Sequence, residues 1–269
     1  MEPFRFQPGP APLLISMPHV GTHLPDALAR RMTDVARTVP DTDWHVDRLY
    51  DFAASLGANL LTATHSRYVI DLNRPPDGTA LYPGASNTEL CPTTSFDDEP
   101  LWQPGEAPGA DEIQQRIASF WRPYHGRLAQ TLADVKSRFG TALLFDAHSI
   151  RSEVPRFFGG RLPDINLGTA DGKSAPSELA ARLIEAAGEA DGYSSVLNGR
   201  FKGGYITRHY GKPAEGVAAV QLELSQITYM DETAPFGFRE DRAKGIRPHL
   251  RRILETMLDW AREAKGLRW

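Results

Sequence analysis

The sequence contains one cysteine, Cys91, among its 269 residues. A single cysteine excludes an internal disulfide and any zinc site that uses several cysteines. No apolar run approaches the roughly eighteen residues that suggest a membrane-spanning helix. The N-terminal segment also lacks the basic and apolar stretches of a signal peptide. We therefore expect a cytoplasmic protein with no membrane partner.

An excess of positive charge is also missing. Lysine and arginine number 30 against 34 aspartate and glutamate residues, which gives a net charge of −4. This balance argues against nucleic acid or an anionic membrane surface as a partner. An anionic small molecule would need a local cluster of arginine or lysine side chains. The hydrophobic content of 41% is that of an ordinary globular protein.

Segments typical of strands and helices alternate along the chain. Short apolar runs predict strands at 12–17, 59–64, 68–72, 142–148 and 217–225. Helical spacing of apolar residues predicts helices over 41–57, 113–135, 176–188 and 246–258. Because no linker separates two halves, we expect residues 1–269 to form one α/β domain with a largely parallel sheet.

Residues 75–109 hold eleven proline or glycine residues. A connection of this length inside a compact domain is uncommon, and it is usually functional or mobile. The segment is therefore a candidate lid or arm over a binding site.

The segment TALLFDAHSI, residues 141–150, ends in Asp146, His148 and Ser149. These residues suit either a nucleophilic serine with its base or a metal site. Neighbouring side chains of a strand point to opposite faces, so His148 cannot easily take a proton from Ser149. Asp146 shares a face with His148, but about two strand rises separate them. This geometry disfavours a catalytic triad built from this segment alone.

A metal site here would draw on residues far apart in the sequence. His19 follows the first predicted strand, and His148 holds a similar position in its own strand. Strand ends of this kind assemble ligand sites in open α/β sheets. Two histidines, one carboxylate and an open position form a common catalytic zinc site. Asp43 and Asp47 are the candidate carboxylates, although each could instead cap a helix, and His19 could merely cap a turn.

The segment VQLELSQ, residues 220–226, alternates apolar and polar side chains, which sets Glu223 on the face opposite Leu222 and Leu224. If helices cover both faces of the sheet, Glu223 is a buried acid with a raised pKa, suited to proton transfer. If the face is exposed, Glu223 is an ordinary solvated side chain.

Two clusters of polar residues suggest an anionic substrate. SRYVIDLNRPP contains Arg67, Asn73 and Arg74, and GGYITRHYG contains Gly204 and Arg208. Arginine binds carboxylates through paired hydrogen bonds, so two clusters favour a dicarboxylic ligand. The alternative is that these arginines form structural ion pairs with nearby aspartates.

Together, several segments resemble the N-formylglutamate amidohydrolase (deformylase) family. They are SMPHVGTHLP, DTDWHVDRLY, RYVIDLNRPP, LCPTTSF, FWRPYH, LLFDAHSI, FKGGYITRHYG and QLELSQITYM, in family order across nearly the whole chain. The resemblance implies a zinc carboxypeptidase-like fold, with a central mixed, largely parallel sheet flanked by helices on both faces. It also implies hydrolysis of N-formyl-L-glutamate to formate and L-glutamate, a step of histidine breakdown.

Carried onto this sequence, the resemblance implies that His19, Asp43 and His148 bind one divalent metal ion, with Asp47 as the second choice of carboxylate. Zinc is the expected ion, although cobalt, nickel, iron or manganese would suit such ligands. Glu223 falls at the position of the general base. From its place on the His148 face of the strand, Asp146 would orient a ligand or the substrate.

The resemblance also implies that Asn73 and Arg74 hold a substrate carboxylate. Arg67, Arg208 and Gly204 are the expected further substrate contacts. The rival interpretations are a hydrolase of N-succinyl or N-acetyl glutamate or aspartate, a non-catalytic dicarboxylate-binding protein, and a serine hydrolase. No feature of the sequence predicts the oligomeric state.

Overall fold

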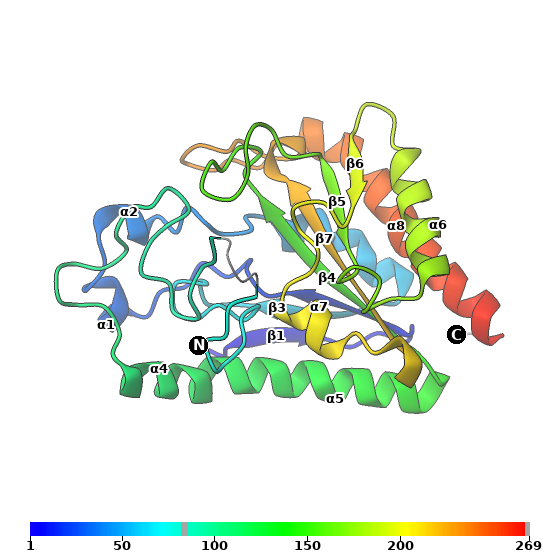
Figure 1. Cartoon of the computed structure of the whole chain (residues 1–269), viewed down its shortest axis with the longest axis horizontal. Coiled ribbons are helices and arrows are strands. Elements are labelled where there is room, and N and C mark those ends of the chain that lie inside the picture. The colour runs from blue at the N-terminus through cyan, green and yellow to red at the C-terminus, as the bar shows by residue number, and fades with distance from the viewer. Residues whose placement is uncertain (82–85, 267–269) are drawn as a thin grey trace.

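The structure, a computed structural model, describes residues 1–81 and 86–266. Within these ranges seven strands form one sheet in the order β1-β3-β2-β4-β7-β5-β6 (Figure 1). The strands are β1 Phe4–Gln7, β2 Leu13–Met17, β3 Asn59–Ala63, β4 Ala142–Ile150, β5 Ile165–Gly168, β6 Ser195–Leu197 and β7 Val217–Ser225. Strands β3, β2, β4 and β7 run parallel, whereas β1 pairs antiparallel with β3 and β5 with β7. The predicted mixed, largely parallel sheet is confirmed.

Helices flank both faces of this sheet. The α-helices are α1 Asp26–Ala29, α2 Asp34–Arg37, α3 Val46–Leu49, α4 Ala110–Arg116, α5 Arg122–Phe139, α6 Ser177–Gly188, α7 Tyr205–Tyr210 and α8 Glu240–Lys265. The part of the chain that the structure describes also contains three 3₁₀ turns, η1 Asp51–Leu56, η3 Pro213–Glu215 and η4 Gln226–Thr228, and a π-helical turn, η2 Ile117–Trp121. No helix of the described ranges has the length and apolar character needed to cross a membrane.

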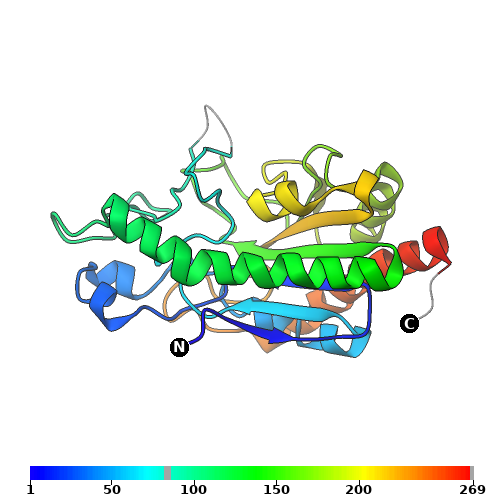
Figure 2. The same ribbon diagram turned by 90° about the horizontal axis from the view of Figure 1, so that it is seen from below.

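The two faces of the sheet are covered by different helices. Helix α5 runs along one face, while α6 and α8 lie on the other (Figures 1 and 2). Leu144 and Ala219 pack toward the α5 side, and Phe145 and Val220 pack toward the α6 and α8 side. Every residue of β4 and β7 is therefore buried. A polar side chain on either strand therefore costs free energy unless it finds a partner.

The predicted helix over 41–57 is wrong in its first part. Residues 41–45 form turns, and helix α3 begins at Val46 after His45, whose φ of 62° is left-handed. Asp43 does not cap this helix, since its Oδ2 accepts the backbone N–H of Ser149 at 3.2 Å. The predicted end at Gly57 is confirmed.

The predicted strand at 68–72 is also wrong. Val69 and Ile70 are buried as the apolar run suggests, but the segment forms a turn closed by a hydrogen bond from Val69 N–H to Ser66 O. Strands β1, β5 and β6 and helix α7 were not predicted; each has at most six residues, too few to show a clear period.

The described part of 75–109 contains turns and isolated bridges, such as that between Thr94 and Pro100. Residues 82–85 of this candidate lid lie outside the described residues. Ser86, Asn87 and Phe96 come from the segment and line the pocket described below. The segment thus supplies a wall of that pocket, and its role as a lid stays a prediction.

Candidate metal and substrate site

Polar side chains converge where the parallel strands end. His19 follows β2, and His148 and Glu223 are neighbours in the register of β4 and β7. Asp43 enters from the turn before α3, where its backbone N–H donates to the carbonyl of His19 at 3.0 Å. Carboxyl ends of parallel strands thus gather these groups at one edge of the sheet, as expected for an open α/β sheet.

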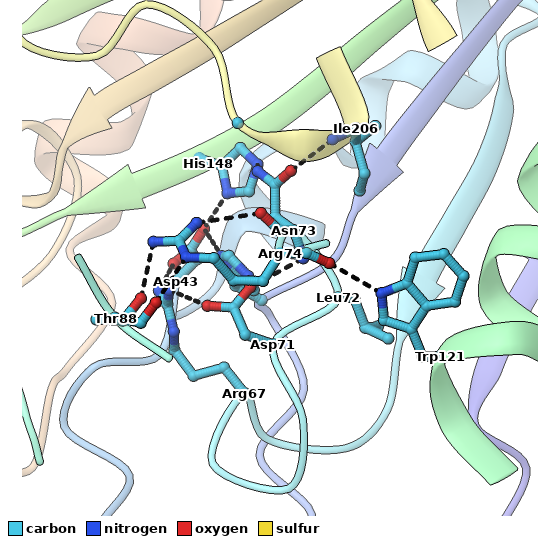
Figure 3. Close-up of polar contacts among 12 residues, drawn as sticks. Asp43, Arg67, Asp71, Leu72, Asn73, Arg74, Thr88, Trp121, His148 and Ile206 are labelled. Carbon is cyan, nitrogen blue, oxygen red and sulfur yellow. Dashed lines mark hydrogen bonds and ion pairs between the residues drawn. The ribbon is translucent and has the colours of Figure 1, made fainter. Parts of the chain in front are cut away.

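His19, Asp43 and His148 form a buried group whose ligand atoms all lie within 4.8 Å of one another. Asp43 Oδ2 is 3.0 Å from His148 Nδ1 and 3.8 Å from His19 Nδ1. The close-up in Figure 3 shows His148 and Asp43 facing each other. Two imidazoles and a carboxylate can hold a divalent metal ion. Asp47, the second choice, lies near the surface and pairs with Arg5 at 3.0 Å.

A second carboxylate holds the far nitrogen of each imidazole. His19 Nε2 lies 2.7 Å from Asp71 Oδ1, and His148 Nε2 lies 3.0 Å from Asp146 Oδ2. An Nε2–H that donates to a carboxylate leaves the lone pair on Nδ1, the atom that faces Asp43. Metal-ligating histidines commonly have this arrangement. The donor set therefore fits a metal ion in its orientation as well as in its residue types.

The charges of the cluster also favour a cation. Asp43, Asp71 and Asp146 are all buried, and Arg67 contacts two of them, at 2.6 Å for Asp71 and 3.9 Å for Asp43. Burial opposes a charged imidazole, yet the carboxylates of Asp146 and Asp43 raise the pKa of His148 well above its ordinary value. A proton on His148 supplies positive charge to the cluster, and a divalent cation would supply more.

Glu223 is a buried acid beside this group. The residue is 7% exposed, so the predicted burial of this acid is confirmed, and burial raises the pKa of its carboxyl to about 8. Gln221 Nε2 donates to Glu223 Oε2 at 3.3 Å, and Gln221 Oε1 accepts the backbone N–H of Gly204 at 2.7 Å. Gln221 thus orients the acid, a role that was not predicted from the sequence although the residue lies on the same strand face.

The Asn73 side chain connects three segments of the chain. Its Nδ2 donates to Asp146 Oδ2 at 3.2 Å and lies 2.9 Å from His148 Nε2. Its Oδ1 accepts the N–H of Ile206 at 2.8 Å (Figure 3). A Cβ atom added to Gly204 would lie 2.3 Å from Asn73 Nδ2. Glycine at 204 therefore lets α7 approach the site closely.

Arg74 reaches the loop that follows it. Its Nε donates to Thr88 O at 3.0 Å and its Nη2 to Thr88 Oγ1 at 2.7 Å. Arg67 instead donates to Asp71, with its guanidinium 4.9 Å from the ring centroid of Phe96. The two arginines of this cluster thus line one pocket but have different partners.

A pocket with about 590 Å³ of atom-free space, its open mouth included, lies over these groups. It is lined by the predicted residues His19, Asp43, Arg67, Asn73, Arg74, His148, Gly204 and Glu223. Arg200 also lines it, together with Phe157 and Phe201; its only sequence signal was its place just before FKGGYITRHYG. Asp146 lies behind His148. Arg208 is exposed, is not among the described residues that line the pocket, and donates to Gly203 O at 2.7 Å.

Ser149 turns away from His148, as strand alternation predicts. Its Oγ accepts from Tyr229 Oη at 2.7 Å and from Gln226 Nε2 at 3.3 Å. The expected separation of Asp146 and His148 is wrong, because their side chains share one face of the strand and reach each other, with Asp146 Oδ2 3.0 Å from His148 Nε2. The structure therefore pairs His148 with the carboxylates of Asp43 and Asp146 and not with Ser149.

Comparison with known proteins identifies relatives of this chain. The sequence profile of the family described as N-formylglutamate amidohydrolase matches residues 11–230. An N-formylglutamate deformylase of Pseudomonas aeruginosa is 56% identical over 262 residues, which cover 97% of this chain and 98% of that protein. One from Pseudomonas putida is 54% identical over 258 residues, 96% of each chain. The crystal structure of N-formylglutamate amidohydrolase from Ralstonia eutropha covers 98% of this chain and 100% of its own, with 27% identity and a TM-score of 0.80.

Proposed function

The chain belongs to the N-formylglutamate amidohydrolase family, and from this we propose that it hydrolyses N-formyl-L-glutamate to formate and L-glutamate with one divalent metal ion. The observation that carries the proposal is the buried group of His19, Asp43 and His148 at the base of a pocket, with Glu223 beside it. In our proposal the ion is zinc, since two imidazoles and a carboxylate suit it.

His19 and His148 would each hold this ion through Nδ1, and Asp43 would hold it through a carboxylate oxygen. A divalent ion supplies Lewis acidity, which makes a water molecule more acidic and polarises a carbonyl group. Asp71 and Asp146 would keep both imidazoles in the tautomer and orientation that binding requires, as their hydrogen bonds to Nε2 support.

Glu223 would act as the proton carrier. It would accept a proton from the attacking water while the water oxygen bonds to the formyl carbon. It would then donate that proton to the nitrogen as the carbon–nitrogen bond breaks, which releases formate and L-glutamate. Burial supports this role, because a carboxyl with a pKa of about 8 gives and takes protons readily near neutral pH.

The arginines of the pocket would hold the carboxylates of the substrate. Arg74 keeps the role that the resemblance implies, and Arg200 joins it because it lines the same pocket. Arg67 and Asn73 also line the pocket. Arg67 donates to Asp71 at the same time, and Asn73 donates to Asp146. Gly204 forms part of the wall, and Arg208 stays a prediction of the resemblance. Held in this way, the substrate would present its formyl group in one orientation, which lowers the entropic part of the barrier.

The test combines metal analysis with a formate-release assay on N-formyl, N-acetyl and N-succinyl glutamate. We expect formate from N-formyl-L-glutamate and little release of acetate or succinate from the other two. Glu223→Gln should keep metal and substrate binding but lose about 10²- to 10⁴-fold in kcat. Glu215→Gln is the matched control, because this exposed residue lies just before the other end of β7.

Near-normal turnover by Glu223→Gln would remove that residue from the mechanism. Formate release that persists after complete metal removal would contradict the metal assignment, and sensitivity to Ser149→Ala would then favour a serine hydrolase. Binding of N-formyl-L-glutamate without any formate release would favour the non-catalytic alternative.

A further inference from the structure

The helical segment from α4 to α5 holds the loop that carries Arg67, Asp71, Asn73 and Arg74. Three side chains of this segment donate to backbone carbonyls of the loop: Arg116 Nη1 to Val69 at 2.9 Å, His125 Nε2 to Leu72 at 2.8 Å and Trp121 Nε1 to Arg74 at 3.0 Å. Figure 3 shows the indole of Trp121 directed at the Leu72–Arg74 backbone. The loop has no regular secondary structure, so these bonds supply fixed points for its backbone.

The π-helical turn η2 explains how one segment presents all three donors. Arg116 and Trp121 are five residues apart, which in an α-helix would place them about 140° apart around the axis. A π turn, with its i to i+5 hydrogen bonds, returns the fifth residue to nearly the same side. Trp121 and His125 are then separated by one ordinary α-helical turn. The turn at Ile117–Trp121 therefore aligns Arg116, Trp121 and His125 toward the loop.

Trp121 and His125 form a stacked pair. Their rings stack with centroids 3.7 Å apart and planes at 21°. Burial lowers the pKa of His125 to about 3, so its imidazole is neutral and can donate from Nε2 while Nδ1 accepts from Tyr210 Oη at 3.0 Å. The indole of Trp121 has one hydrogen-bond donor and no acceptor, and this N–H donates to the carbonyl of Arg74.

We propose that Trp121 is a positioning residue for substrate binding, which fixes the Arg74 side chain in the pocket by holding the Arg74 carbonyl. Trp121 is absent from the described residues that line the pocket, so it acts through Arg74 and not by contact with the ligand. Arg74 would contact the ground state and the transition state of the substrate alike. Loss of its position should therefore raise KM and leave kcat nearly unchanged. The inference rests on the proposed function.

The experiment measures formate release by the metal-loaded full-length protein carrying Trp121→Phe. Phenylalanine keeps an aromatic ring against His125 but cannot donate to Arg74. We expect KM for N-formyl-L-glutamate to rise about tenfold, equivalent to about 1.4 kcal/mol, with kcat within about twofold and metal content unchanged.

Trp260→Phe is the matched control. Trp260 is buried on α8, and its Nε1 has no hydrogen-bond partner among the described residues, so the same chemical change removes no bond. An unchanged KM in Trp121→Phe would overturn the inference. So would a parallel loss of kcat and metal content in that variant, or an equal rise of KM in Trp260→Phe, since either would mark a general structural role. Wild-type protein that releases no formate would instead overturn the proposed function, and this inference with it.

Discussion

Asp146→Asn isolates the contribution of one buried carboxylate to metal binding. Asp146 Oδ2 accepts from His148 Nε2 at 3.0 Å and from Asn73 Nδ2 at 3.2 Å, and its Oδ1 accepts from Ser16 Oγ at 3.0 Å. Asparagine has the same shape. Its carbonyl can keep the first two bonds, and its amide can donate to the Ser16 hydroxyl. The substitution thus removes a charge without leaving a buried polar group unpaired.

The expected loss is about ten- to a hundredfold in metal affinity, the usual effect of removing a carboxylate that orients a histidine ligand. Two effects of opposite sign set where in this range the value falls. The charge of Asp146 makes His148 a stronger ligand, but it also raises the pKa of His148, so that protons compete with the metal. In Asp146→Asn this pKa falls and the competition weakens. We therefore expect the affinity gap between the two proteins to widen as the pH rises, until His148 is deprotonated in both.

The assay is competition for the metal with a chromogenic chelator, from neutral to alkaline pH, with Ser149→Ala as the control on the opposite face of β4. At saturating metal, Asp146→Asn should recover most of its formate release, because the three ligands remain. An Asp146→Asn variant that binds the metal as tightly as the wild type at every pH would refute the reasoning. Low activity at saturating metal with unchanged affinity would show instead that Asp146 acts in the chemical step.

Two further predictions compare matched variants. Asp43→Asn should lower metal affinity by at least about a hundredfold, because it removes a charged ligand, whereas Asp47→Asn should bind metal like the wild type. Equal losses of affinity in a metal titration of the two variants would contradict the assignment of Asp43 as the ligand. Gly204→Ala should displace the side chain of Asn73, which its Cβ would approach to 2.3 Å, and lower kcat/KM by about tenfold. Gly126 lies on α5, where an added Cβ would meet no other atom, so Gly126→Ala should raise the free energy of unfolding by about 0.5–1 kcal/mol and leave kcat/KM unchanged. Urea unfolding and the kinetic assay test both variants; a loss of kcat/KM in Gly126→Ala with normal kinetics in Gly204→Ala would contradict the prediction.

The parts of the fold that the sequence predicts are those in which local periodicity and burial agree. The strands β4 and β7 and the helices α5, α6 and α8 each carry a regular apolar pattern that the packed structure satisfies. The same alternation correctly separated His148 from Ser149 and set Glu223 on the face opposite Leu222 and Leu224; the burial of Glu223, which the pattern left open, follows from the helices that cover both faces. These inferences needed only that side chains of a strand alternate and that both faces of the sheet are covered.

The segments at 41–45 and 66–74 could not be predicted in this way. Their conformation is set by contacts with distant residues. For example, the backbone N–H of Ser149 donates to Asp43, and the indole N–H of Trp121 donates to the Arg74 carbonyl. The local pattern favoured the start of a helix at the first segment and a strand at the second, and long-range hydrogen bonds overrode both preferences. The partnership of Asp71 with His19 was missed for the same reason, since the two are 52 residues apart.

The site is marked by polar residues at buried positions of two strands. The strands β4 and β7 lie in the core of the sheet, yet at one end they bury Asp146, His148, Gln221 and Glu223. Each buried polar group would cost free energy if it were left unpaired, so the fold can contain them only with their partners fixed. The partners come from the neighbouring strand β2, from the turn at Asp43 and from the loop held by the π-helical turn. The stability of this end of the sheet and the geometry of the site therefore depend on the same hydrogen bonds, and a change that loosens the loop should impair substrate binding before it unfolds the protein.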